Sequence, residues 1–79
     1  QKETIARGIA NQIYREIQAA GKNKVSQNWL VNAIHVCIKA DKSVVDDITA
    51  LTIETLAGNT SGAVLRKTAD GYERTVPMA

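Results

Sequence analysis

The sequence predicts a mainly α-helical domain, a three-helix bundle followed by a C-terminal β-hairpin. Apolar residues recur at helical spacing in three segments, at about residues 3–20, 26–40 and 44–57. Residues that start or stop helices bound these segments. Two runs compatible with strands, at about 63–68 and 72–76, then flank turn-forming residues from Thr68 to Gly71.

One domain spanning residues 1–79 accounts for the chain, because 79 residues that are 44% hydrophobic and 23% charged are typical of a small globular protein. It begins with Gln1 and not with Met, which indicates a domain excised from a longer protein. The single Cys37 excludes an internal disulfide and fits a reducing, cytoplasmic compartment. The longest apolar run, 29–38, is about half the length that crosses a bilayer, and no signal peptide is visible, so we expect no membrane association.

The first predicted helix has one apolar face and one basic face. An isoleucine recurs at every fourth position, at Ile5, Ile9, Ile13 and Ile17. Gly21 supplies the left-handed residue that ends the helix. The opposite face carries Arg7 and Arg15 among amide side chains, and Lys22 extends it. Such a face is either solvated or able to contact phosphates.

The second predicted helix begins at the N-cap Ser26 and is apolar over most of its circumference. We therefore expect it to be the buried central element. Its least exposed side chains should be Trp29, Leu30, Ile34, Cys37 and Ile38. A narrow polar stripe remains at Asn28, Asn32, His35 and Lys39.

The third predicted helix is capped by Ser43, and the helix dipole favours Asp46 and Asp47 in its first turn. Its inward stripe consists of Val45, Ile48, Leu51, Thr52 and Leu56. Ile53 points away from this stripe, alongside Ala50 and Ala57, at about 100° per residue. These three residues form either an ordinary exposed patch or a contact for a second copy.

The predicted hairpin places two arginines opposite each other. Counting outward from a turn in which Gly71 forms a bulge, Lys67 opposes Glu73 and Arg66 opposes Arg74. Alternation then puts Arg66, Tyr72 and Arg74 on one face of the ribbon and Leu65 on the other, with Pro77 closing the second strand. Facing arginines repel unless an anion such as a phosphate lies between them. Alternatively, the Leu65 side packs on the helices and the arginines are solvated.

The net charge of +2 is unevenly distributed. Residues 1–42 carry +4, residues 43–61 carry −3 and residues 62–79 carry +1. The first and last segments could therefore contact nucleic acid, whereas the third predicted helix is acidic.

No arrangement of residues predicts catalysis, a cofactor or a metal. His35 and Cys37 lie two positions apart on a helix, so their side chains diverge by about 200°. A zinc site needs three or four ligands, and the chain has no second His or Cys. Asp46 and Asp47 point in different directions, and there is no phosphate-cradling loop with its lysine. We expect no enzyme and no small-molecule substrate.

In the order and length of its elements the whole chain resembles winged helix-turn-helix domains: helix, short extended link at 22–25, helix, turn, helix, hairpin. The likeness is one of topology and not of a residue motif. It implies a DNA-binding domain associated with transcription or replication, in which the helix before the hairpin contacts the major groove. Here that helix carries Asp46, Asp47 and Glu54 and no Lys or Arg. Some winged helices dock proteins and not DNA, and a simple three-helix bundle with an appended hairpin is a further alternative.

Two functions remain open. In the first, the domain binds double-stranded DNA, alone or as a dimer, through Arg7, Arg15, Lys22, Arg66, Lys67, Tyr72 and Arg74. In the second, it is a protein-interaction module that docks a partner or a second copy through Asp46, Ala50, Ile53, Glu54 and Ala57. The positions of Arg7, Arg15, Arg66, Lys67 and Arg74 discriminate between them, since one shared face favours DNA and dispersal favours protein docking.

Overall fold

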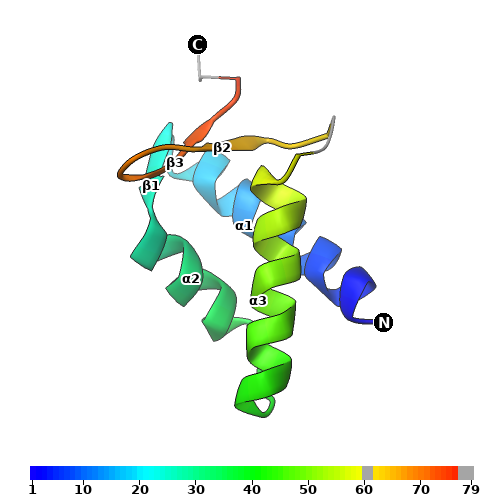
Figure 1. Ribbon diagram of the computed structural model, residues 1–79. Coiled ribbons are helices and arrows are strands. Elements are labelled where there is room, and N and C mark those ends of the chain that lie inside the picture. Colours follow the sequence, from blue (N-terminus) through cyan, green and yellow to red (C-terminus); the bar gives the residue numbers. More distant parts are fainter. Residues whose placement is uncertain (60–61, 77–79) are drawn as a thin grey trace.

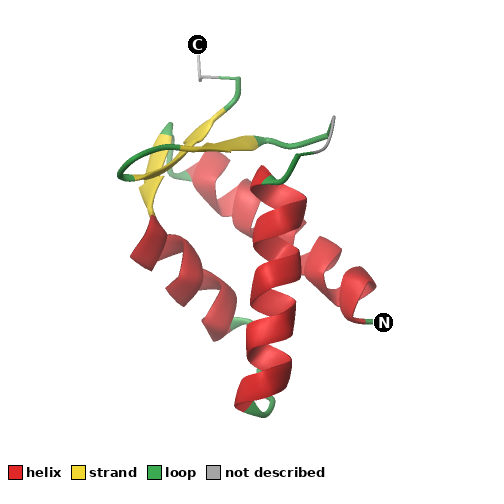
Figure 2. Cartoon of the chain, in the orientation of Figure 1, coloured by secondary structure: helices red, strands yellow, loops and turns green. Residues whose placement is uncertain are grey.

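The computed structural model describes residues 1–59 and 62–76; Pro77, the predicted end of the second hairpin strand, lies outside this range. Three helices precede a hairpin, and a short strand links the first two helices (Figures 1 and 2). The elements are α1 (Lys2–Ala19), β1 (Lys24–Ser26), α2 (Gln27–Val36), α3 (Lys42–Ala57), β2 (Leu65–Lys67) and β3 (Gly71–Arg74). The predicted fold class, mainly α-helical with a C-terminal hairpin, is confirmed.

The helix α1 follows the predicted pattern. Its buried side chains are Ala6, Ile9, Ala10, Ile13 and Ile17. Ile5 belongs to the same repeat but lies near the helix start, where it is 48% exposed. After the helix, Gly21 adopts the predicted left-handed conformation with φ 66°.

The prediction that the second helix is the buried central element is wrong. Ser26 caps α2 as predicted, since its Oγ accepts a hydrogen bond from the Trp29 N–H at 3.0 Å. The helix ends at Val36, however, and only Leu30 and Ile34 are buried. Cys37 is exposed, and Trp29 and Ile38 are partly buried. The physical reason is that α1 packs along α3, which leaves α2 covered on one side only (Figure 1).

The helix α3 is instead the element that touches α1, α2 and β2. It begins at Lys42 with Asp41 as its N-cap residue, and not after Ser43. Because neighbours lie on several sides, its covered arc is wider than a single stripe. Ile53 and Ala57 fall within this arc and pack against the core, so the prediction that they point away together with Ala50 is wrong for both. Ala50 is exposed.

The three strands form one antiparallel sheet in the order β1-β3-β2, so the last strand is central. The predicted hairpin register is wrong by one residue: Arg66 pairs with Glu73, Lys67 with Tyr72 and Leu65 with Arg74. The observed register places Leu65 and Tyr72 on the same face, where both are buried. The predicted register would have put them on opposite faces and left one without the core.

The turn is one residue shorter than predicted, as the shifted register requires. Only Ala69 and Asp70 form the loop, because the Thr68 N–H donates to the Gly71 oxygen at 2.8 Å and closes the ladder without a bulge. Gly71 is required by close packing: a Cβ there would collide with the carbonyl oxygen of Val25 and lie 2.9 Å from the Cα of Ser26. The glycine therefore lets β1 approach β3.

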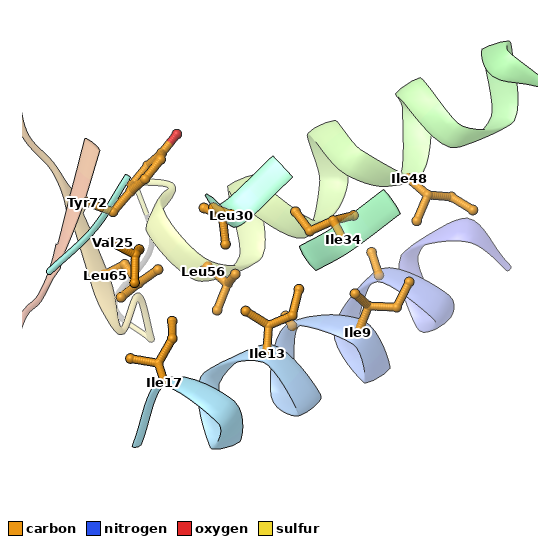
Figure 3. Packing of buried hydrophobic residues seen from close by; sticks show 12 residues of the cluster. Ile9, Ile13, Ile17, Val25, Leu30, Ile34, Ile48, Leu56, Leu65 and Tyr72 are labelled. Carbon is orange, nitrogen blue, oxygen red and sulfur yellow. The ribbon is translucent and has the colours of Figure 1, made fainter. Parts of the chain in front are cut away.

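The core lies between the three helices, and the inner face of the sheet closes it at one end (Figure 3). Side chains of all three helices meet Val25, Leu65 and Tyr72 from the three strands. The Tyr72 ring lies at the edge of this cluster and its hydroxyl points away from it (Figure 3). Within residues 1–59 and 62–76, no helix has the length and apolar character to span a membrane.

Candidate functional site

The outer face of the sheet carries a row of charged side chains. On the central strand, Glu73 has Lys24 of β1 as its partner on one side and Arg66 of β2 on the other. Directly paired residues share a face, and strands two apart are separated by about 10 Å. Arg66 donates from Nε at 3.1 Å and from Nη2 at 2.8 Å to the same Glu73 oxygen, Oε1. Two exposed cations thus flank one carboxylate that is already partly engaged.

Arg74 does not face Arg66, as the predicted register required, and it does not face solvent. It lies on the inner face with Leu65 and is 8% exposed. Its guanidinium lies 5.5 Å from the centroid of the Tyr14 ring, and Nη2 donates to the Tyr14 hydroxyl at 3.3 Å. Nε and Nη1 are buried without a hydrogen-bond partner. The predicted pair of arginines around an anion is therefore absent, and Arg74 is not available to a phosphate on the surface.

Two more exposed lysines lie against aromatic rings near the sheet. Lys67 Nζ is 5.0 Å from the centroid of Tyr72, and Lys22 Nζ is 5.6 Å from that of Trp29. Both contacts orient a cation without neutralising it. We call Lys22, Lys24, Arg66 and Lys67 together the basic sheet end. Lys24 was missed in the sequence, although its alternation with the buried Val25 in a short extended link was a usable signal.

Arg7 and Arg15 are exposed on α1, as predicted. The five cations chosen from the sequence nevertheless do not share one face. Arg66 lies on the outer face of the sheet, Lys67 and Arg74 belong to the inner face, and the other two lie on a helix. By the criterion set above, their dispersal favours protein docking over DNA for this particular set.

The predicted protein interface on α3 is only partly exposed. Asp46, Ala50 and Glu54 are exposed, whereas Ile53 and Ala57 are half-buried against the core. Lys42 Nζ donates to Asp46 Oδ2 at 2.7 Å, and this hydrogen bond raises the pKa of Lys42. The neighbouring Asp47 forms an ion pair with Lys2 at 2.8 Å. Two of the three carboxylates of α3 therefore already form an ion pair with a lysine.

An open groove between α1 and α2 was not predicted. We call it the α1–α2 groove; it has a volume of about 310 Å³. It is lined by Gln12, Glu16, Trp29, Asn32, Ala33, Val36 and Cys37. The signal in the sequence is the apolar circumference of the second helix, which predicts burial of this helix and not an open groove beside it. Over the described part of the chain, no three side chains of His, Cys, Asp or Glu gather as a metal site.

Comparisons with protein-family models, with curated proteins and with solved structures find no match for the chain.

Proposed function

We propose that the domain is a winged-helix-like module that binds double-stranded DNA through phosphate contacts made by the basic sheet end. The observation that carries the proposal is the pair of cations on the outer face of the sheet, where Lys24 and Arg66 flank Glu73. Lys22 lies just before β1, and Lys67 follows Arg66 in β2 on the other face. All four are exposed, and only Asp70 and Glu73 among the sheet and its turn oppose them.

The topology supports the proposal. The order helix, strand, helix, helix, hairpin is that of winged helix-turn-helix domains, and the strand before the second helix completes the likeness noted in the sequence. The charge distribution argues for a different docking geometry from that family. Because α3 contains one lysine, Lys42, against Asp46, Asp47 and Glu54, it keeps a net negative charge that phosphates repel, so the sheet faces the duplex and α3 is turned away.

Contacts of this kind give affinity that depends on salt and not on sequence. Four lysine and arginine side chains can make about four phosphate contacts, and each contributes about −0.9 to the slope of log affinity against log salt. We therefore expect weak, sequence-independent binding that is lost as salt is raised.

The test is a titration of labelled random-sequence duplex, followed by fluorescence anisotropy at several salt concentrations. Lys24→Ala combined with Arg66→Ala should weaken binding and flatten the salt slope by about 1.8. The matched control is Lys39→Ala combined with Lys42→Ala, which removes the same charge at the α2–α3 connection, the end of the fold farthest from the sheet (Figure 1). This control should change the slope little.

Two outcomes would contradict the proposal. If the wild-type protein does not bind duplex at low salt, the domain has no phosphate-binding surface. If Arg7→Ala with Arg15→Ala flattens the slope while the sheet variant does not, the basic face of α1 makes the contacts.

The second candidate function is protein docking through α3, which the dispersal of the five predicted cations and the acidic character of this helix favour. The exposed residues Asp46, Ala50 and Glu54 would then contact a basic partner. Absence of duplex binding, together with loss of such a partner on Glu54→Lys, is the result expected of this alternative.

A further inference from the structure

The outer face of the sheet has a carboxylate between its two cations. Glu73 lies on the central strand β3, and its cross-strand partners are Lys24 of β1 and Arg66 of β2. Side chains of directly paired residues share a face and contact one another, so both cations can reach an anionic group that lies above β3. In this protein that anionic group is its own carboxylate.

Arg66 binds this carboxylate through one edge of its guanidinium. Nε and Nη2 both donate to Oε1 of Glu73, at 3.1 and 2.8 Å. Arginine binds phosphate oxygens with the same donors, because its planar fork fits carboxylates and phosphates alike. The Glu73 side chain is 30% exposed and that of Arg66 is 60% exposed, which makes the carboxylate the less accessible partner of the pair.

Lys24 completes the surroundings of the carboxylate. It is exposed, and it forms no ion pair with another residue in 1–59 or 62–76. A phosphate group placed between Lys24 and Arg66 would be attracted by both cations. It would also lie against the Glu73 carboxylate, and like charges at such short distances repel one another even in water.

We propose that Glu73 is an internal competitor, which occupies the position between Lys24 and Arg66 where a single phosphate group would otherwise bind. The carboxylate thereby excludes free phosphate from the sheet. This exclusion does not depend on DNA binding, whereas the selectivity for a duplex that follows from it rests on the proposed function.

A duplex is accepted because it presents many phosphates. Lys24 and Arg66 lie on strands about 10 Å apart, so each can contact a different phosphate on its own side of Glu73. Arg66 can do so while it stays bound to Glu73, since its Nη1 has no hydrogen-bond partner among the described residues. Glu73 therefore determines specificity, because it disfavours a single small anion and leaves contacts to a polyanion possible.

The test is a nuclear magnetic resonance titration of the ¹⁵N-labelled protein with inorganic phosphate, with chloride adjusted to keep the ionic strength constant. The wild type should show no saturable change. Glu73→Gln keeps the size of the side chain and removes its charge, so phosphate should cause saturable shift changes at the amides of Lys24, Arg66 and residue 73. Glu73→Thr, which is also uncharged and suits a strand, provides a second variant.

The matched control is Asp70→Asn. It removes a carboxylate from the exposed turn of the same hairpin, but not from between the two cations, and it should behave as the wild type does. Phosphate-specific changes in the wild type, their absence in both variants at position 73, or equal changes in Asp70→Asn would each overturn the inference.

A second titration, with labelled random-sequence duplex, separates this inference from the proposed function. At constant ionic strength, inorganic phosphate should not displace the duplex from the wild type but should displace it from Glu73→Gln. Equal displacement from both proteins would overturn the inference. If the wild type does not bind the duplex while Glu73→Gln binds inorganic phosphate, the proposed function is wrong and the exclusion of free phosphate by Glu73 is supported.

Discussion

Replacing the buried Arg74 by an apolar side chain of similar length should stabilise the protein. In the folded state Nε and Nη1 have no hydrogen-bond partner, and a buried polar group left in this way costs about 1–3 kcal/mol. The contact between the guanidinium and the Tyr14 ring stabilises the folded state by about 0.5–2 kcal/mol. Tyr14 itself is partly exposed, so its hydroxyl can bond to water after the change. Arg74→Met should therefore raise the free energy of unfolding by about 1 kcal/mol.

Urea denaturation followed by the fluorescence of Trp29, at one fixed protein concentration, measures this change. A gain of 1 kcal/mol corresponds to a rise in Tm of about 4–8 °C in a domain of this size. The matched control is Arg66→Met, which removes an exposed arginine from the same hairpin and should change stability by less than about 0.5 kcal/mol. If Arg74→Met lowers the free energy of unfolding by more than about 1 kcal/mol, Arg74 is a net stabilising contact and the reasoning is refuted.

Four further substitutions test the packing. Ile34→Ala should lower the free energy of unfolding by about 2–5 kcal/mol because Ile34 is 0% exposed. Val36→Ala on the same helix should lower it by less than about 0.5 kcal/mol. Similar losses of stability in the two variants would show that α2 is not packed as described. Gly71→Ala should cost more than about 1 kcal/mol because its Cβ meets β1. Gly8→Ala, in a helix with no atom near the added Cβ, should gain about 0.5–1 kcal/mol; thermal unfolding of both glycine variants checks these opposite signs.

The helices and the hairpin could be predicted because their signals are local. The isoleucine repeat of α1, the cap at Ser26 and the left-handed Gly21 each depend on a few neighbouring residues, and the structure has all three. The partners of α2 depend on how the helices are arranged, which periodicity alone does not contain. The apolar circumference of α2 therefore predicts central burial, but α3 occupies that position.

The hairpin register depends on which side chains the sheet buries, here Leu65 and Tyr72. The turn composition was compatible with two loop lengths that differ by one residue. Pairing of β3 with both β1 and β2, with Tyr72 beside Val25 and Lys67, selects the shorter loop. This single shift moved Arg74 from the predicted phosphate site into the interior, and it placed Arg66 opposite Glu73.

The most direct test of the proposed function is a nuclear magnetic resonance titration of the ¹⁵N-labelled protein with a short duplex at low salt. We expect the largest amide shift changes at Lys24, Arg66 and Lys67, and their decrease when salt is added. Largest changes within α3, between Asp46 and Glu54, would contradict the proposal that the acidic helix is turned away from DNA. Absence of any change at low salt would show that the basic sheet end does not bind phosphates.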